Sequence, residues 1–246
     1  MSANTPQTSP CVLAMTTSAG VANVAATSAN GLVLFEYSIH DYKTQSLALL
    51  PMLKQHMEQA AVQPADIKAI AADIGPGGFT SLRTTCGVVQ GLATAWGVPV
   101  APISSFECLA AHAQSKHVPM AQGVRCLLDA RLGELYCATL RLTSQGTVWL
   151  KQPFLVSIED AWQSPWHDGE YALPTVMTEA VADLLPAPWP PGTWIGSLSA
   201  VALAELGWHM VHNCTTGEPL ACQPLYVRDK VAQTTAERVA DRHGRV

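Results

Sequence analysis

Residues 73–83 are the stretch of this chain whose residue types and spacing best suit chemistry, Asp-Ile-Gly-Pro-Gly-Gly-Phe-Thr-Ser-Leu-Arg. Glycine allows positive φ and a close approach of another surface. The first turn of a following helix offers unpaired N–H groups at its positive end, so the stretch is a candidate anion site. The residues of this candidate site are Gly75, Gly77, Gly78, Thr80 and Arg83.

The same stretch lacks the groups that a nucleotide loop requires. A phosphate-binding P-loop needs Lys-Ser/Thr after its last glycine, but Phe79-Thr80 follows Gly78 here. The glycine spacing also differs from the Gly-x-Gly-x-x-Gly of a dinucleotide fold. We therefore favour a structural turn over an anion site, and we expect Arg83 to pair with a carboxylate rather than to face an anion.

The histidines and serines give no clear catalytic or metal site. A His-x-x-x-His pair on one helix face would suit a metal, but none of the eight histidines lies four residues from another. Gly-x-Ser-x-Gly of a serine hydrolase is also missing, since Gly196-Ser197 lacks the second glycine. The sequence therefore predicts no metal and no catalytic residue of its own.

Composition narrows the class of protein. Of 246 residues, 48% are hydrophobic and only 13% are charged, with a net charge of −5. A surface so poor in charge suggests cover by another subunit, and the negative balance argues against direct binding of a phosphate backbone. Seven cysteines without Cys-x-x-Cys spacing suggest a reduced, cytoplasmic protein. We expect neither a signal peptide nor a membrane span.

The elements that must position the glycine loop follow an α/β order. Periodicity predicts strands over 12–17, 21–27, 32–38, 67–74, 98–102, 124–129, 134–142, 147–150, 154–156 and 194–196. It predicts helices over 44–61, 79–96 and 199–206, and a further one capped by Ser104 or Ser105. Gly97 suits the C-terminal cap of the second helix. The proline-rich stretch 163–192 predicts irregular structure.

Several motifs, in order, resemble those of the bacterial TsaB (YeaZ) family. The loop resembles its Gly-Pro-Gly-Ser-Phe-Thr-Gly-Leu-Arg signature. Asp129-Ala130-Arg131 with Gly133-Glu134-Leu135-Tyr136 resembles its Asp-Ala-Arg-x-Gly-Glu-x-Tyr motif. Pro224-Leu225-Tyr226-Val227-Arg228 resembles its terminal Pro-x-Tyr-Leu-Arg. The resemblance runs from about residue 12 to residue 230.

The resemblance implies an α/β fold of the ASKHA type, which actin, Hsp70 and sugar kinases share, with two related lobes of mixed sheet flanked by helices. It implies a subunit without catalysis or cofactor that binds TsaD, the catalytic paralogue, in the synthesis of threonylcarbamoyladenosine in tRNA. TsaE, an ATPase, joins through the complex, tRNA is contacted only indirectly, and the chain pairs with itself when TsaD is absent. The chain departs from the family at Thr16, where the first strand usually carries an aspartate.

We predict four segments along the chain. Residues 1–10 form a flexible leader, 11–106 the N-terminal lobe, 107–223 the C-terminal lobe, and 224–246 a return segment with a charged tail. Asp129, Arg131 and Glu134 flank a hairpin turn. They form either a polar cluster that faces a cleft between the lobes or, as we slightly favour, an exposed charged turn.

The helices over 44–61 and 79–96 either bury their apolar residues against the sheet or present one face to another subunit. The candidate interface residues are Leu47, Leu50, Met57, Thr85, Val89 and Thr94. The favoured function is a scaffold for TsaD. The alternatives are a small ATP-dependent phosphotransferase of the same fold and, less favoured, a peptidase.

Overall fold

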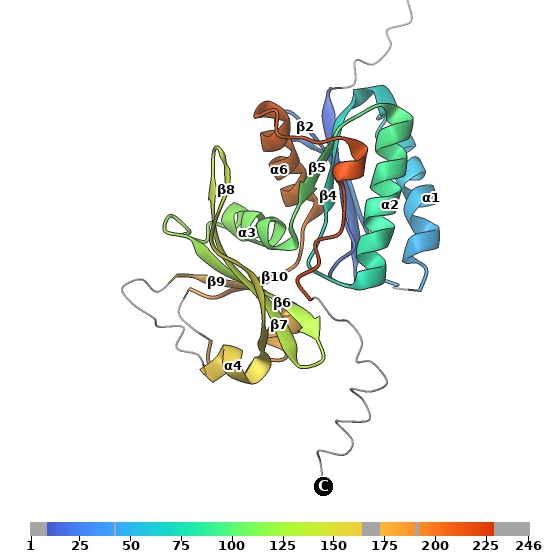
Figure 1. Cartoon of the computed structure of the whole chain (residues 1–246). Helices are drawn as coiled ribbons and strands as arrows, with labels where there is room; N and C mark the ends of the chain where they lie inside the picture. The colour runs from blue at the N-terminus through green and yellow to red at the C-terminus, as the bar shows by residue number, and fades with distance from the viewer. Residues whose placement is uncertain (1–8, 42, 164–172, 190–191, 229–246) are drawn as a thin grey trace, which may run out of the picture.

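The computed structural model describes residues 9–41, 43–163, 173–189 and 192–228. Two five-stranded mixed sheets carry the fold (Figure 1). The first sheet has the order β3-β2-β1-β4-β5 and the second the order β10-β9-β6-β7-β8. The predicted leader lies outside the described residues except for Ser9 and Pro10, and so does the charged tail.

The first sheet is built from β1 (Cys11–Thr16), β2 (Ala22–Ser28), β3 (Val33–Ile39), β4 (Ile67–Asp73) and β5 (Val100–Ile103). The second is built from β6 (Val124–Arg131), β7 (Glu134–Thr143), β8 (Gly146–Ser157), β9 (Thr175–Thr178) and β10 (Trp194–Gly196). In each sheet three consecutive strands pair antiparallel, and two later strands add in parallel beside the first of the three. The two lobes therefore repeat one topology, which confirms the predicted pair of related lobes.

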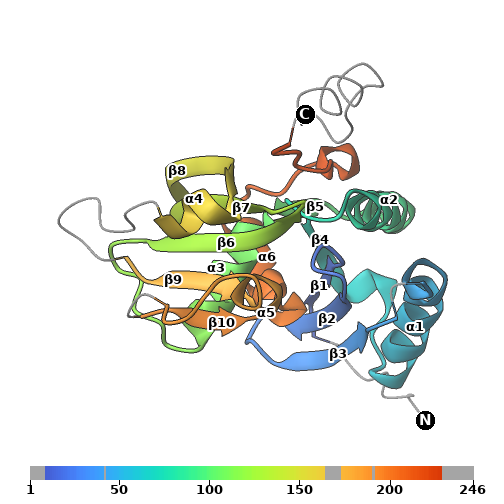
Figure 2. The ribbon, with the colours of Figure 1, turned by 90° about the horizontal axis from the view of Figure 1, so that it is seen from below.

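The helices form three layers around the sheets, and Figure 2 shows α1 and α2 on the outer side of the first sheet. The first layer holds α1 (Gln45–Gln59) and α2 (Phe79–Trp96), and the last holds α4 (Ile158–Gln163) and α5 (Glu179–Ala182). Between the sheets lie α3 (Ser105–Ser115) and α6 (Ala200–His212). Short 3-10 turns, η1 (Pro64–Asp66) and η2 (Pro219–Ala221), complete the described elements.

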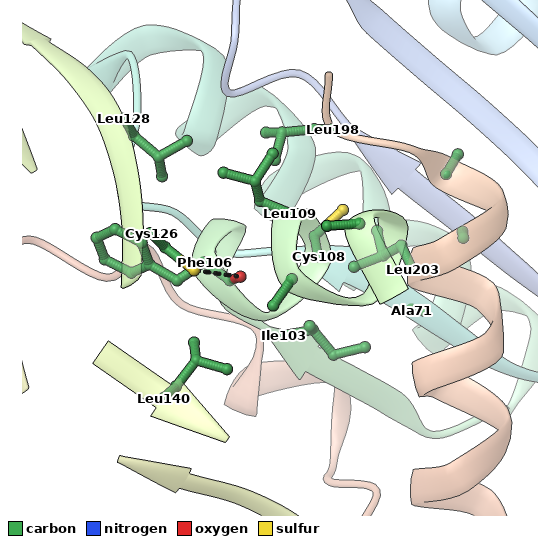
Figure 3. Packing of buried hydrophobic residues seen from close by; sticks show 14 of the residues in the cluster. Ala71, Ile103, Phe106, Cys108, Leu109, Cys126, Leu128, Leu140, Leu198 and Leu203 are labelled. Carbon is green, nitrogen blue, oxygen red and sulfur yellow. Dashed lines mark hydrogen bonds between the residues drawn. The ribbon is translucent and has the colours of Figure 1, made fainter. Parts of the chain in front are cut away.

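The two middle helices cross over between the lobes. Helix α3 follows the first sheet in the chain but packs on β6, β7 and β9, whereas α6 follows the second sheet but packs on β1, β2 and β4. The stretch 107–223 that we assigned to the C-terminal lobe therefore contains a helix that covers the first sheet. One hydrophobic cluster joins both sheets through Phe106 and Leu109 on α3 and Leu203 on α6 (Figure 3).

Local signals explain most element boundaries. Gly97 ends α2 in the left-handed conformation, with φ of 66°, as predicted. Ser104 caps α3 in a capping box with Glu107. Helix α6 runs to His212, past the predicted end at residue 206. Gly207 lets it approach the first sheet closely, since a Cβ there would lie 2.8 Å from Ala71 Cβ.

Three sequence predictions about the second lobe need correction. The stretches 147–150 and 154–156 are one strand, β8, which continues through Pro153. This proline is tolerated because β8 lies at the edge of its sheet. The proline-rich stretch 163–192, expected to be irregular, contains β9 and α5 among its described residues.

Candidate functional site

The glycine loop connects β4 to α2 in the tight strand-to-helix turn that the sequence predicts. Gly75 has φ of 107°, and the Gly75–Pro76 peptide bond is cis. Gly78 is the N-cap of α2 and supplies no side-chain cap. The N–H groups of this turn that have no partner within the chain therefore decide whether it can hold an anion.

The turn between β1 and β2 lies directly on the glycine loop. A Cβ on Gly77 would lie 2.5 Å from Ser18 Cβ and 2.8 Å from the Ser18 carbonyl oxygen. The Gly78 N–H donates to that carbonyl oxygen at 3.3 Å. Ser18 therefore packs against Gly77 and takes up the Gly78 N–H, which is then not available to an anion.

Beneath the loop, the Asp73 carboxylate accepts four hydrogen bonds. Oδ1 accepts from the Gly75 N–H at 2.9 Å and from Ser105 Oγ at 2.6 Å. Oδ2 accepts from Thr16 Oγ1 at 2.6 Å and from Ser18 Oγ. The loop N–H nearest the strand is thus bonded to a carboxylate of the chain itself.

Asp73 has no exposed surface, and none of the ion pairs among the described residues includes it. Burial raises the pKa of Asp73 above its ordinary value of 3.8, and the hydrogen bonds from Ser105, Ser18, Thr16 and Gly75 oppose that rise. Sequence reasoning missed this group, although an acid that follows the apolar run Ala69–Ala72 is unusual and needs partners.

Thr80 and Arg83 lie on the first turns of α2. Thr80 is exposed, and its carbonyl accepts from Thr84 Oγ1 at 3.0 Å. Arg83 does not form the expected carboxylate pair in the described chain. It donates from Nε to the Tyr226 hydroxyl at 3.1 Å, and its guanidinium carbon lies 3.9 Å from the centre of the Phe79 ring. Arg83 therefore fastens the return segment to α2.

A cleft of about 1010 Å³ opens between the lobes beside the glycine loop. Residues 18–21 and 76–81 line it from the first lobe, and residues 128–131 line it from the second. Its charged side chains are Glu36, Lys116, Asp129, Arg131, Glu179 and Glu205. Acidic groups outnumber basic ones, which disfavours a polyphosphate.

The predicted polar cluster divides in two. Arg131 Nη1 lies 3.0 Å from Asp129 Oδ2, and both residues line the cleft. Glu134 is not part of the lining and pairs instead with Arg228 of the return segment, at 2.5 Å between Nη2 and Oε2. Arg228 Nη2 also donates to the Ala130 carbonyl oxygen at 3.0 Å.

The predicted interface residues also divide. Leu47 and Leu50 on α1 are exposed, by 78% and 46%, and Thr94 on α2 is exposed. The other three are buried in the first lobe and are not available to a partner, which corrects the prediction. Met57 and Val89 pack in the cluster between the first sheet and α1 and α2. Thr85 Oγ1 lies 2.6 Å from Thr17 Oγ1.

Other candidate centres give little. In the part of the chain that the structure describes, no group of three or more His, Cys, Asp or Glu side chains is placed to hold a metal ion. His112 Nδ1 donates to the Ser197 backbone oxygen at 2.7 Å and so does not address a serine hydroxyl through that nitrogen. No described helix is long and apolar enough to span a membrane.

The comparisons with known proteins agree on one family. A family model described as TsaD, tRNA N6-adenosine threonylcarbamoyltransferase, matches residues 40–181, more than half of the chain. A structure from Pseudomonas aeruginosa, described as an uncharacterized protein with similarity to peptidase YEAZ, is 25% identical with a TM-score of 0.74. That match covers 90% of this chain and 100% of the other. YeaZ from the same organism is also 25% identical, with a TM-score of 0.72, over 89% of this chain and 100% of the other.

Curated relatives named tRNA threonylcarbamoyladenosine biosynthesis protein TsaB match over shorter stretches. The Haemophilus influenzae protein is 34% identical over 38% of this chain and 39% of its own length. The Escherichia coli protein is 34% identical over 41% of this chain and 42% of its own length. The chain thus spans about two fifths of the length of these relatives. Together with the shared fold, the matches show that this chain belongs to the TsaB (YeaZ) family and carries the TsaD-type domain of the ASKHA fold.

Proposed function

We propose that the chain is a non-catalytic subunit that supports a TsaD-type catalytic paralogue in the synthesis of threonylcarbamoyladenosine in tRNA. One observation carries the non-catalytic part of this proposal: Ser18 covers Gly77 and accepts the Gly78 N–H. A nucleotide-using relative of this fold would need that surface for phosphate.

The charges around the loop support the same function. Asp73 lies beneath the loop and takes up the Gly75 N–H. The cleft beside it has more acidic than basic side chains, so a bound triphosphate would meet mainly like charge. The chain then contributes binding to a partner and not a catalytic step.

The partners follow from family membership and from the surface. Leu47 and Leu50 expose apolar side chains on α1, which suits contact with a TsaD-type chain or, without it, with a second copy. A TsaE-type ATPase joins through the complex. With a net charge of −5, contact with tRNA is indirect. Six of the seven thiols are buried and all seven are free, which suits the reducing cytoplasm.

Titration calorimetry with ATP and magnesium tests the non-catalytic role. We expect no heat of binding at micromolar concentrations from the isolated full chain. The TsaD-type paralogue of the same organism, titrated into the chain under the same conditions, is expected to bind. Micromolar ATP binding by the isolated chain contradicts the proposal.

Light scattering tests the partnership. We expect the chain mixed with its TsaD-type paralogue to elute at the summed mass of a complex. Elution of the two proteins at their separate masses, at concentrations of tens of micromolar, overturns the scaffold role.

One observation favours the second candidate, an ATP-dependent phosphotransferase. The cleft volume of about 1010 Å³ lies at the upper end of the size of small-molecule sites. This candidate requires Ser18 to leave Gly77 when nucleotide binds, so it predicts that ATP changes the amide signals of Gly77 and Gly78. The calorimetry above separates it from the scaffold role.

A further inference from the structure

Four separate segments of the chain meet at the carboxylate of Asp73. They are the end of β1 through Thr16, the β1–β2 turn through Ser18, the glycine loop through Gly75, and the first residue of α3, Ser105. Each segment donates one hydrogen bond. A single buried group with a donor from each of four segments fixes their relative positions.

Two further contacts connect this cluster to the covering of the loop. Ser105 Oγ also lies 3.0 Å from the Pro76 carbonyl oxygen, and the Ser105 N–H donates to the Gly75 carbonyl oxygen at 2.7 Å. The loop is thus held from above by Ser18 and from below by Asp73 and Ser105. Removing the acceptor takes the 2.6 Å partner from the buried Thr16 hydroxyl, which costs more than the loss of an exposed hydrogen bond.

We propose that Asp73 is a positioning residue: its Oδ2 holds Ser18 over Gly77, while its Oδ1 holds Gly75 and Ser105, so that the β1–β2 turn stays packed on the glycine loop. This role of Asp73 goes beyond the proposed function. It holds or fails whether or not the chain binds a TsaD-type partner.

Amide hydrogen exchange of the full chain, measured by NMR, tests the proposal residue by residue. The reporters are the Gly75 N–H, which donates to Asp73, and the Gly78 N–H, which donates to Ser18. The internal reference is the amide of Ala138, which is fully buried on β7 of the second sheet.

In Asp73→Ala we expect the protection of the Gly75 and Gly78 amides to fall about tenfold or more relative to Ala138. The Gly75 N–H loses its acceptor, and the Gly78 N–H loses the contact that holds its acceptor, Ser18, in place. Asp73→Asn keeps one carbonyl oxygen, and its amide can donate to the Thr16 and Ser18 hydroxyls. We therefore expect Asn to retain most of the protection. The matched control, Asp183→Asn at an exposed acid, is expected to change neither reporter.

Three outcomes overturn the proposal. One is unchanged protection of both glycines in Asp73→Ala. Another is an equal loss at Ala138, which indicates global destabilisation only. The third is an equal loss in the Asn and Ala variants. If Asp73→Ala does not fold, Ser105→Ala removes one of the four donors and must still lower the protection of Gly75.

An exchange of side chains gives an independent test. Thr16 and Asp73 lie side by side on β1 and β4, at 2.6 Å between hydroxyl and carboxylate oxygens. Thr16→Asp alone brings two carboxylates into contact and should lower the thermal midpoint. Adding Asp73→Ser leaves one carboxyl among hydroxyls and should recover part of that loss. A strictly additive double variant contradicts a shared acceptor site.

Discussion

Ser18 and Gly77 are packed so closely that only glycine fits at position 77: a Cβ would approach Ser18 Cβ to 2.5 Å and its carbonyl oxygen to 2.8 Å. Gly77 does not need positive φ, so the requirement is one of space. The contact joins the first turn of the chain to the loop before α2, and several measurements follow from it.

Gly77→Ala should destabilise the protein by about 1–3 kcal/mol, because the backbone of Ser18 must move to admit the methyl group. Gly87→Ala is the matched control on α2, where a Cβ meets nothing within 4 Å. The control should be neutral or stabilising by up to about 1 kcal/mol, since alanine favours a helix. Urea unfolding measures both, and equal effects of the two variants would contradict the packing argument.

The pH dependence of stability should carry the signature of Asp73. Because burial raises the pKa of Asp73 above 3.8, the folded state binds its proton more tightly than the unfolded state. The free energy of unfolding of the native protein, relative to Asp73→Asn, should be greatest below pH 3.8 and should fall as pH rises through the folded pKa. Urea unfolding across that range checks the sign, and a difference that grows with pH rules out the raised pKa.

Arg228→Gln should loosen the return segment. Arg228 is only 13% exposed at its side chain and pairs with Glu134, whereas Arg131, which pairs with Asp129, is 79% exposed. We expect a loss of about 1–3 kcal/mol for Arg228→Gln and at most about 1 kcal/mol for the control Arg131→Gln. Faster exchange of the Leu225 N–H, which donates to the Ile74 carbonyl oxygen at 2.7 Å, should accompany the first change alone.

Association should depend on the exposed leucines of α1. Leu47→Glu combined with Leu50→Glu should weaken self-association or binding to the TsaD-type chain by about tenfold or more, which corresponds to roughly 1.4 kcal/mol. Light scattering and calorimetry measure this. Leu132→Glu, at a leucine that is 80% exposed on the second lobe, is the control. Equal affinities for the native and double-variant proteins exclude this face.

The buried interface candidates behave differently. Val89 has no exposed surface and packs in the first-lobe cluster. Val89→Glu should therefore unfold the lobe instead of weakening association selectively. Circular dichroism distinguishes the two results because it reports whether the variant is folded. A Val89→Glu monomer that remains folded contradicts the burial of Val89.

Local patterns were enough to predict most of the fold. The apolar runs of β1 and β4, the Gly97 cap and the Ser104–Glu107 capping box are all local signals. Strand β9 and helix α5 were missed because each has only four residues and lies in a proline-rich stretch. Such short elements form through tertiary contacts more than through their own propensity.

The site was harder to predict because its parts are far apart in the sequence. The donors to Asp73 come from residues 16, 18, 75 and 105, and only the bond from Gly75, two residues after Asp73, follows from local spacing. The interface candidates failed for a similar reason. Met57 and Val89 are apolar in the same way as Leu47 and Leu50, and only packing against the sheet shows which side of a helix is covered.

The crossing of α3 and α6 between the lobes has a mechanical consequence. Each helix is covalently joined to one sheet and packed on the other, so a hinge motion that opened the cleft widely would have to pull both helices out of a shared apolar cluster. The energy of that cluster resists such opening. We expect the molecule to behave as one stiff body that unfolds in a single calorimetric transition, suited to presenting a fixed surface.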